Sequence, residues 1–536
     1  MQEIRGTAAS AGLALGPAKL LPRRVAGQSR AVLDPARERQ LLDDALDLAR
    51  REISTLGTRA AAADRAIFTF QVEVLADQGL IVEIRRYIEA GAGAAAAVER
   101  AAGIYAAKMR SIPDEYLAQR AGDILDACRR VVDILDGRPR TPFAVAEPCV
   151  LIADELLPSD IVSLDREKVL GIVTAGGSTQ SHASIIARTF GIPAVVLAGA
   201  EILGLPEGTL CAVDGAAGLV TADPDEATFA RYAHRINLAR RRRLSLERLI
   251  TTPCVSRDGI AVRLMANCSG PQDVQRAREL GADGVGLLRS EFLFLGGKIP
   301  DEAEQTAFYT ACVREAQGLP ITIRTLDIGA DKEVAGLTCE EPNPALGLRG
   351  LRFSLARPDL FYTQLAALLK AGLAGPLKVM FPMVSSVEDL DGALAAVDEV
   401  RRMLSLRGEA FSERVQFGIM VETPAAALLA DELAARAAFF SIGTNDLTQY
   451  THAADRVNPA VERYYTPASP AVLRLMRFVC RSAAAAGIEV SVCGESAADP
   501  ELALLYARAG VRCLSMAAPS IAEVKERLLD ENILLG

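Results

Sequence analysis

The chain lacks tryptophan, and its aromatic residues make up only 5% of 536 positions. It also lacks an excess of basic residues, because 68 Asp and Glu against 59 Lys and Arg give a net charge of −9. Proteins that bind nucleic acids generally present a positive surface, often with aromatic side chains on which bases stack. The composition therefore argues against a nucleic-acid-binding protein.

Signals for membrane insertion and export are missing as well. No uncharged apolar run reaches the ~18 residues that a membrane-spanning helix needs. Residues 1–5 do not show the basic, apolar and small-residue order of a signal peptide. The ten cysteines form no CxxC pair and no cluster with zinc-ligand spacing. We therefore expect a cytoplasmic protein with reduced thiols and no membrane span.

The N-terminal half divides into three regions by composition. Half of all residues are hydrophobic and 24% are charged, which is globular composition with material for about three domains. Residues 1–22 contain short β segments with glycines. Apolar residues then recur at helical spacing, which predicts a bundle of roughly four helices within residues 23–137. The apolar segments of this bundle are 41–49, 67–87, 90–108 and 116–135.

A different pattern follows Gly137. Short apolar runs separated by turns predict an α/β domain over 138–224. Its predicted strands are 150–153, 169–173, 194–197, 211–213 and 219–220. The polar segment 225–252 is typical of a connecting helix. It contains four consecutive arginines, 240–243, which we interpret as a solvated helix face, although such a run can also bind an anion or a partner.

The region 253–536 alternates strand-like apolar runs with amphipathic stretches. Eight βα units in this length predict a TIM (β/α)8 barrel, with a doubly wound open sheet as the alternative. The eight runs are 262–266, 284–288, 321–326, 377–383, 415–421, 437–443, 488–493 and 511–516. The fold class is therefore multidomain α/β: a helical bundle, an α/β domain and a C-terminal barrel.

Polar residues stand at or just past the ends of five of these runs. In a barrel, the chemistry is carried at the C-terminal edge of the strands, so a shared position at five strand ends predicts one site. Isolated helix caps or salt bridges would not place them on the same edge. These strand ends are Arg289 with Glu291, Arg324 with Asp327, Glu422, Asn445 with Asp446, and Cys493 with Glu495.

Arginines dominate this predicted site. Arg289 and Arg324 offer forked cations that suit phosphate or carboxylate oxygens. Arg349 and Arg456 lie on neighbouring loops and can add to them. The substrate should therefore be a small anionic molecule that carries phosphate and carboxylate groups.

Two carboxylates and one thiol complete the predicted site. Glu422 and Asp446 provide oxygen ligands, which fits Mg²⁺ held by one or two carboxylates together with substrate oxygens. Cys493 at its strand end can donate or accept a proton. A lone cysteine in a strand can equally be a small hydrophobic core residue, so the residue alone leaves its role open.

A second candidate site lies in the α/β domain. The Gly-rich turn at 176–181 delivers His182 to the start of an amphipathic segment at 183–190. A helix N-terminus favours an anion, and a neutral imidazole there can act as nucleophile and hold a phosphoryl group. The chain has three histidines; we expect His234 to be an exposed residue of the connector and His452 to be structural.

The residues around His182 resemble a known family. Ser181-His182-Ala183, Ile186-Ala187-Arg188 and the segment 191–195 are similar to the phosphohistidine motif of the phosphoenolpyruvate-utilising enzymes. Five further stretches resemble the Enzyme I branch of that family, the phosphoenolpyruvate–protein phosphotransferases of the sugar phosphotransferase system. The resemblance covers about residues 3–530, and its stretches are 284–292, 324–329, 420–426, 440–450 and 493–495.

This resemblance implies roles for individual residues. His182 would accept the phosphoryl group through Nε2, and Cys493 would protonate the pyruvate enolate. Glu422 and Asp446 would hold Mg²⁺. The residues that would contact phosphoenolpyruvate are Arg289, Arg324, Asn445, Asp446 and Arg456.

The resemblance also implies an organisation into domains. Residues 1–22 would join 138–224 in a swivelling phosphohistidine domain, and 23–137 would dock the small carrier protein HPr. Residues 225–252 would form a linker helix to a phosphoenolpyruvate-binding barrel, 253–536, through which the chain forms a homodimer. Transfer from barrel to carrier requires a hinged swing, for which Gly137 and 222–226 are the candidate hinges.

Three departures from the family pattern concern phosphoryl transfer. Gln180 and Ile161 stand where the family usually has threonines near the active histidine, and Gln71 stands where the docking helix commonly has a histidine. Two alternatives follow. An ATP-linked relative would need a large nucleotide-binding domain, and no segment here has its length or its Gly-rich loop. A signalling paralogue would phosphorylate itself without turning over a carrier.

Overall fold

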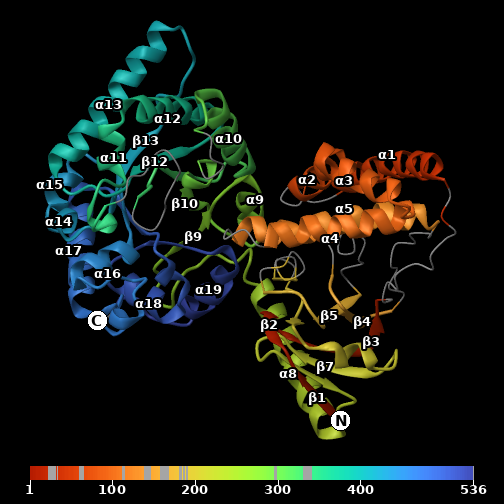
Figure 1. Cartoon of the computed structure of the whole chain (residues 1–536). Coiled ribbons are helices and arrows are strands. Elements are labelled where there is room, and N and C mark those ends of the chain that lie inside the picture. The colour runs from red at the N-terminus through yellow and green to blue at the C-terminus, as the bar shows by residue number, and fades with distance from the viewer. Residues whose placement is uncertain are drawn as a thin grey trace. The chain divides into compact units, whose positions relative to one another are not determined.

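The computed structural model describes most of the chain as two compact units, residues 1–241 and 242–536 (Figure 1). The expectations placed on Ile161, Gln180 and His182 fall outside the described residues. Those described are 1–21, 32, 34–59, 65–110, 115–137, 147–156, 168–179, 181, 184, 187–188, 191–294, 299–329 and 341–534.

The first unit contains a helical bundle whose apolar faces meet in one core. Leu42, Ile84 and Val131 are among its fully buried side chains. The segment 67–87, expected as a single helix, is divided because the Asp77 carboxylate accepts a hydrogen bond from the Leu80 amide at 2.7 Å and so starts a new helix. The helices are α1 (Pro35–Arg59), α2 (Arg65–Ala76), α3 (Gln78–Glu89), α4 (Ala94–Arg110) and α5 (Glu115–Leu135).

The same unit contains an eight-stranded sheet in the order β1-β8-β7-β3-β4-β5-β6-β2. Strands β3 to β6 run parallel, and the remaining strands pair antiparallel at the two sides. Each predicted strand is present. The strands are β1 (Gln2–Arg5), β2 (Thr7–Ser10), β3 (Leu13–Leu20), β4 (Cys149–Ala153), β5 (Val169–Thr174), β6 (Ala194–Val196), β7 (Leu210–Asp214) and β8 (Leu219–Ala222), with a short helix η1 (Ala200–Gly204) after β6.

The connector is the helix α8 (Glu226–Glu247). Its arginines 240–242 are exposed, as the solvated-face interpretation predicts, and Arg242 forms an ion pair with Glu526. His234 is exposed on the same helix, as expected. None of the helices in the described residues combines the length and the apolar composition that crossing a bilayer requires.

The second unit is a closed barrel of eight parallel strands, so the TIM barrel is confirmed and the open-sheet alternative is wrong. Each strand lies on one of the eight predicted runs, within a residue or two. The strands are β9 (Arg263–Cys268), β10 (Val285–Arg289), β11 (Ile321–Arg324), β12 (Leu377–Phe381), β13 (Gln416–Val421), β14 (Phe439–Ile442), β15 (Glu489–Val492) and β16 (Cys513–Met516).

Helices surround the barrel and bury its outer face (Figure 1). The α-helices are α9 (Pro271–Glu279), α10 (Glu302–Glu315), α11 (Leu351–Ala356), α12 (Pro358–Ala371), α13 (Val387–Leu406), α14 (Pro424–Leu428), α15 (Ala430–Ala434), α16 (Thr444–His452), α17 (Pro470–Ala486), α18 (Pro500–Arg508) and α19 (Ile521–Leu529). Short helices are η2 (Glu291–Leu293), η3 (Pro344–Leu346), η4 (Gly372–Ala374), η5 (Pro459–Tyr464), η6 (Glu495–Ala498) and η7 (Ala518–Ser520). Because all eight strands are parallel, their carboxyl ends form one rim of the barrel.

Candidate active site

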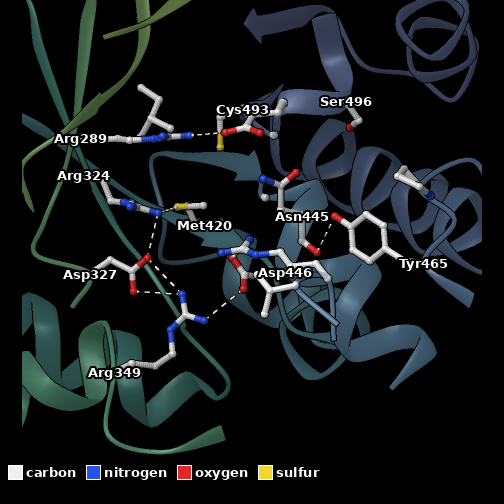
Figure 2. Close-up of a pocket in the computed structure, with 17 residues that line it drawn as sticks. Arg289, Arg324, Asp327, Arg349, Met420, Asn445, Asp446, Tyr465, Cys493 and Ser496 are labelled. Atoms are coloured by element: carbon white, nitrogen blue, oxygen red, sulfur yellow. Dashed lines mark hydrogen bonds and ion pairs between the residues drawn. The ribbon is translucent and has the colours of Figure 1, made fainter. Parts of the chain in front are cut away.

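A cavity of about 560 Å³ opens at this rim of the barrel (Figure 2). Four arginines and three carboxylates line it, above a partly apolar floor. The lining residues are Leu287, Arg289, Arg324, Asp327, Arg349, Met420, Gly443, Asn445, Asp446, Arg456, Val457, Tyr465, Pro467, Cys493, Gly494, Glu495 and Ser496. The structure thus brings every residue predicted to contact substrate, and Cys493, into one cavity.

The first two arginines are the last residues of neighbouring strands, β10 and β11. Arg289 is partly exposed, and its Nη2 lies 3.1 Å from Glu495 Oε1. Arg324 is buried, forms an ion pair with Glu291, and has its Nη1 3.0 Å from Asp327 Oδ2. Burial alone would lower the pKa of Arg324, but these carboxylates outweigh it and raise the pKa above its ordinary value. Arg324 is therefore a fixed cation.

Arg349 joins two parts of the rim that are distant in sequence. Its Nη2 donates to both Asp327 oxygens at 3.2 Å, while its Nη1 donates to Asp446 Oδ1 at 3.1 Å and to the Tyr450 hydroxyl at 3.2 Å. Only 3% of Arg349 is exposed. The next residue, Gly350, has φ +56° and approaches so closely that a Cβ there would lie 3.3 Å from Asp327 Oδ1. The close approach of the Gly350 backbone to Asp327 therefore positions the neighbouring Arg349 at the rim.

Asp446 and Arg456 continue the chain of alternating charges. Asp446 lies in the first turn of α16, with its Oδ2 3.6 Å from Arg456 Nη1. The Arg456 amide donates to Gln449 Oε1 at 3.1 Å, which ties its loop to the helix. The carbonyl of Asn445 accepts a hydrogen bond from the Tyr465 hydroxyl at 3.2 Å. The amide side chain of Asn445 lies at the cavity (Figure 2).

Glu422 lies directly behind the cavity lining and is completely buried. Its Oε1 accepts a hydrogen bond from the Met383 amide at 2.6 Å, whereas its Oε2 has no hydrogen-bond partner among the described residues. A Cβ on the lining residue Gly443 would lie 2.8 Å from that oxygen. Burial, together with the neighbouring Asp446 and Asp327 carboxylates, raises the pKa of Glu422 to about 8. An unpartnered, buried carboxylate oxygen next to a second carboxylate is a donor set that fits a divalent cation.

In the described part of the chain, no group of three or more Asp, Glu, His or Cys side chains is placed to hold a metal ion by itself. A cation bound by Glu422 and Asp446 would thus depend on oxygens from a substrate for much of its coordination, as Mg²⁺ commonly does.

Cys493 follows β15 and lies at the floor of the cavity. It is 2% exposed, and its Sγ lies 3.7 Å from the carbonyl of Ile442. Burial raises the pKa of Cys493 to about 11, so the thiol keeps its proton at neutral pH. A protonated thiol beside a substrate cavity can act as a general acid.

The turn that precedes His182 is partly described. After β5, the Gly176 amide donates to Asp154 O at 2.9 Å, and the Gly176 carbonyl accepts from the Thr174 hydroxyl at 2.8 Å. Farther on, the Ser184 hydroxyl donates to Ser178 O at 2.7 Å. His452, by contrast, has its Nε2 2.7 Å from the hydroxyl of Ser469, the residue that caps α17, which supports the structural interpretation of that histidine.

Comparison with known proteins bears on both sites. Family models described as PEP-utilising enzyme match residues 5–120 (N-terminal), 145–218 (mobile domain) and 243–533 (PEP-binding domain), the last being more than half of the chain. The chain belongs to the PEP-utilising enzymes. The resemblance stated from the sequence is therefore confirmed.

Curated relatives of this PEP-utilising enzyme extend over almost its whole length. A phosphoenolpyruvate-protein phosphotransferase of Geobacillus stearothermophilus is 38% identical over 534 residues, which are 98% of this chain and 92% of the relative. That of Bacillus subtilis (strain 168) is 36% identical and covers 98% and 94%, respectively. A multiphosphoryl transfer protein of Rhodobacter capsulatus is 40% identical over 98% of this chain, which spans 63% of that relative's length.

Sequence reasoning missed part of this PEP-utilising enzyme's cavity. Asp327 was noted only as a strand end, and Arg349 only as a possible supplement, yet together they connect Arg324 to Asp446. Tyr465 was not singled out, because it lies in a loop far from any strand end. The one local signal for Arg349 was the adjacent Gly350, which marks a close backbone approach.

Proposed function

We propose that this chain is a phosphoenolpyruvate–protein phosphotransferase. It transfers the phosphoryl group of phosphoenolpyruvate to His182 and then to a histidine of the carrier HPr, releasing pyruvate as the first step of sugar uptake by the phosphotransferase system. The observation that carries this proposal is the cavity itself, in which four arginines and the buried thiol of Cys493 line one space. The relatives named as phosphotransferases of this kind support it.

The arginines suit the two charged groups of the substrate. Phosphoryl transfer depends mainly on positioning and on stabilising the charge that spreads over the phosphate oxygens. Arg324 and Arg349 are already held by carboxylates, so little reorganisation is needed when the substrate binds. Arg289 and Arg456 are more exposed and can close on the phosphate or the carboxylate from the cavity mouth.

The bond changes follow from these positions. His182 Nε2 attacks phosphorus, a nitrogen–phosphorus bond forms, and the bond from phosphorus to the enol oxygen breaks. The enolate that leaves takes the thiol proton of Cys493 on its methylene carbon and becomes pyruvate. The Cys493 thiolate then regains a proton from solvent.

Glu422 and Asp446 are the residues that would hold Mg²⁺. The ion would neutralise negative charge on the phosphate oxygens. The unpartnered Oε2 of Glu422 supports this assignment.

His182 must reach both the barrel and the carrier, so we propose that the phosphohistidine domain (residues 1–22 with 138–224) swings about hinges near Gly137 and 222–226. The bundle 23–137 docks HPr. The helix 225–252 links the phosphohistidine domain to the barrel 253–536. Two chains form a homodimer through their barrels, and the protein acts in the cytoplasm. Within the bundle, Gln71 is buried and its Nε2 donates to Asp126 Oδ2 at 3.0 Å. That side chain serves the bundle core, so the docking surface must be formed by other residues.

Labelling with phosphoenolpyruvate tests the proposal. Incubation with Mg²⁺ should give an acid-labile, base-stable phosphoprotein, and mass spectrometry should place the phosphoryl group on His182. Purified HPr should then remove it catalytically. A His182→Ala variant that still incorporates label would refute the proposal, and self-phosphorylation without turnover of HPr would favour the signalling paralogue.

A further inference from the structure

The floor of the cavity differs in chemistry from its walls. Leu287, Met420 and Cys493 line the cavity and also belong to the apolar cluster that fills the barrel interior. Two further members of that cluster, Met380 and Phe439, do not line the cavity. The floor is therefore apolar and holds the Cys493 thiol, whereas the four guanidinium groups line the rest of the cavity together with Val457, Pro467 and Tyr465.

Met420 is held in place at this floor from two sides. It is 3% exposed, and its Sδ lies 3.8 Å from Arg324 Nη1, a guanidinium that is itself fixed by carboxylates. A Cβ on Gly443 would lie 2.8 Å from the Met420 methyl carbon, so this methyl occupies the space beside the glycine. Figure 2 shows the side chain between Arg324 and Asn445, below Cys493. Methionine is usually adaptable, but this one has little room to move.

Phosphoenolpyruvate has one apolar part, its methylene group. Placing that group on the floor leaves both anionic groups to the arginines and puts the methylene carbon near the Cys493 thiol. From this geometry we propose that Met420 determines specificity at the methylene carbon: it contacts that carbon and excludes enol phosphates that carry a substituent there. The inference rests on the proposed function and adds the basis of substrate selection.

The size of the effect follows from packing. A methyl group added to the substrate would have to displace Met420, whose sulfur and methyl carbon are both confined. One additional methylene in a close-fitting pocket changes relative kcat/KM by roughly 10- to 200-fold. Removing the Met420 side chain beyond Cβ opens the floor and should remove most of that discrimination.

The test compares two substrates in the full-length protein with HPr. One is phosphoenolpyruvate; the other is the enol phosphate of 2-oxobutyrate, which has one extra methyl group on the methylene carbon. Met420→Ala should narrow the ratio of their kcat/KM values by about tenfold or more. Met420→Leu, which conserves volume, should keep the wild-type ratio.

Met380→Ala is the matched control. It makes the same truncation in the same cluster, outside the cavity lining, so it reproduces the loss of packing without opening the floor. An unchanged ratio in Met420→Ala, or an equal narrowing in Met380→Ala, would overturn the inference. If Met420→Ala does not fold, two other results would overturn the inference. One is a wild type whose kcat/KM values for the two substrates are nearly equal, and the other is a changed ratio of these values in Met420→Leu. Failure of the wild type to release pyruvate from phosphoenolpyruvate would instead refute the proposed function.

Discussion

The chain of alternating charges at the barrel rim makes a quantitative prediction. Replacing Arg349 by methionine keeps the buried apolar stem but removes the hydrogen bonds to Asp327, Asp446 and Tyr450. The two carboxylates then remain buried with one cation fewer. We expect the free energy of unfolding of the barrel to fall, because a buried carboxylate that loses its partner stays desolvated.

The magnitude can be estimated from the remaining partners. Breaking a buried ion pair costs about 3–5 kcal/mol. Asp327 keeps Arg324 at 3.0 Å, and Asp446 keeps Arg456 at 3.6 Å, so we place the loss at the lower end, about 3 kcal/mol. Asp446→Asn removes the same contact from its other side. The double variant should therefore be less destabilised than the sum of the single variants, with a coupling energy of about 2 kcal/mol.

Differential scanning calorimetry of the full chain can measure this effect. The barrel transition is identified as the one that a substitution in the bundle leaves in place. Arg349→Lys keeps the charge but cannot reach all three partners with one ammonium group, so it should fall between wild type and methionine. A loss below about 0.5 kcal/mol, or additivity within that margin, would refute the idea that Arg349 couples these acids.

Four further predictions concern single positions. Gly494→Ala should destabilise the barrel by about 1–3 kcal/mol, since the new Cβ would lie 1.7 Å from Thr444 Oγ1 and 2.9 Å from the Thr444 backbone nitrogen. A barrel transition at the wild-type temperature in calorimetry would contradict this prediction. Gly103→Ala, with open space around it in α4, should instead stabilise the bundle by about 0.5–1 kcal/mol, and a lower bundle transition would argue against that. Asp77→Ala should cost about 1 kcal/mol through loss of the α3 cap, measured by denaturant unfolding, while Asp77→Asn should keep most of the stability. Because burial raises the pKa of Cys493 to about 11, its thiol stays neutral at pH 8 and should react with iodoacetamide far more slowly than glutathione does. By linkage, the contribution of this neutral thiol to the free energy of unfolding is complete below about pH 9 and is lost as the pH rises to 11.

Much of the barrel could be predicted from sequence because its signal is local. Each buried parallel strand is a short apolar run, and each run is followed by a helical pattern, so the eight runs could be counted directly. The bundle was predicted less accurately, since Asp77 interrupts a continuous apolar pattern and its capping role depends on backbone geometry. A single polar residue within a helical stretch reads as a solvent-facing position as easily as a cap.

The residues of the candidate site also divide into those that the sequence could predict and those that it could not. Arg289, Arg324 and Cys493 come from strand ends, where the geometry of parallel strands fixes which edge they share. Arg349 and Tyr465 come from loops, whose paths depend on packing between segments distant in the sequence. The pattern therefore predicted which strand-end residues share one cavity, but it did not reveal that carboxylates hold the arginines.

Under the proposed function, the pairing of these charges gives a reason for a metal ion in an arginine-rich cavity. Four arginines line it, but three carboxylates line it as well, and Glu291 and Glu422 lie just behind. The arginines are thus fixed in direction while much of their charge is already balanced. A substrate with both a phosphate and a carboxylate would bring more negative charge than the side chains can neutralise. Under the proposed function, a dication held by Glu422 and Asp446 would supply the missing positive charge beside the phosphate oxygens.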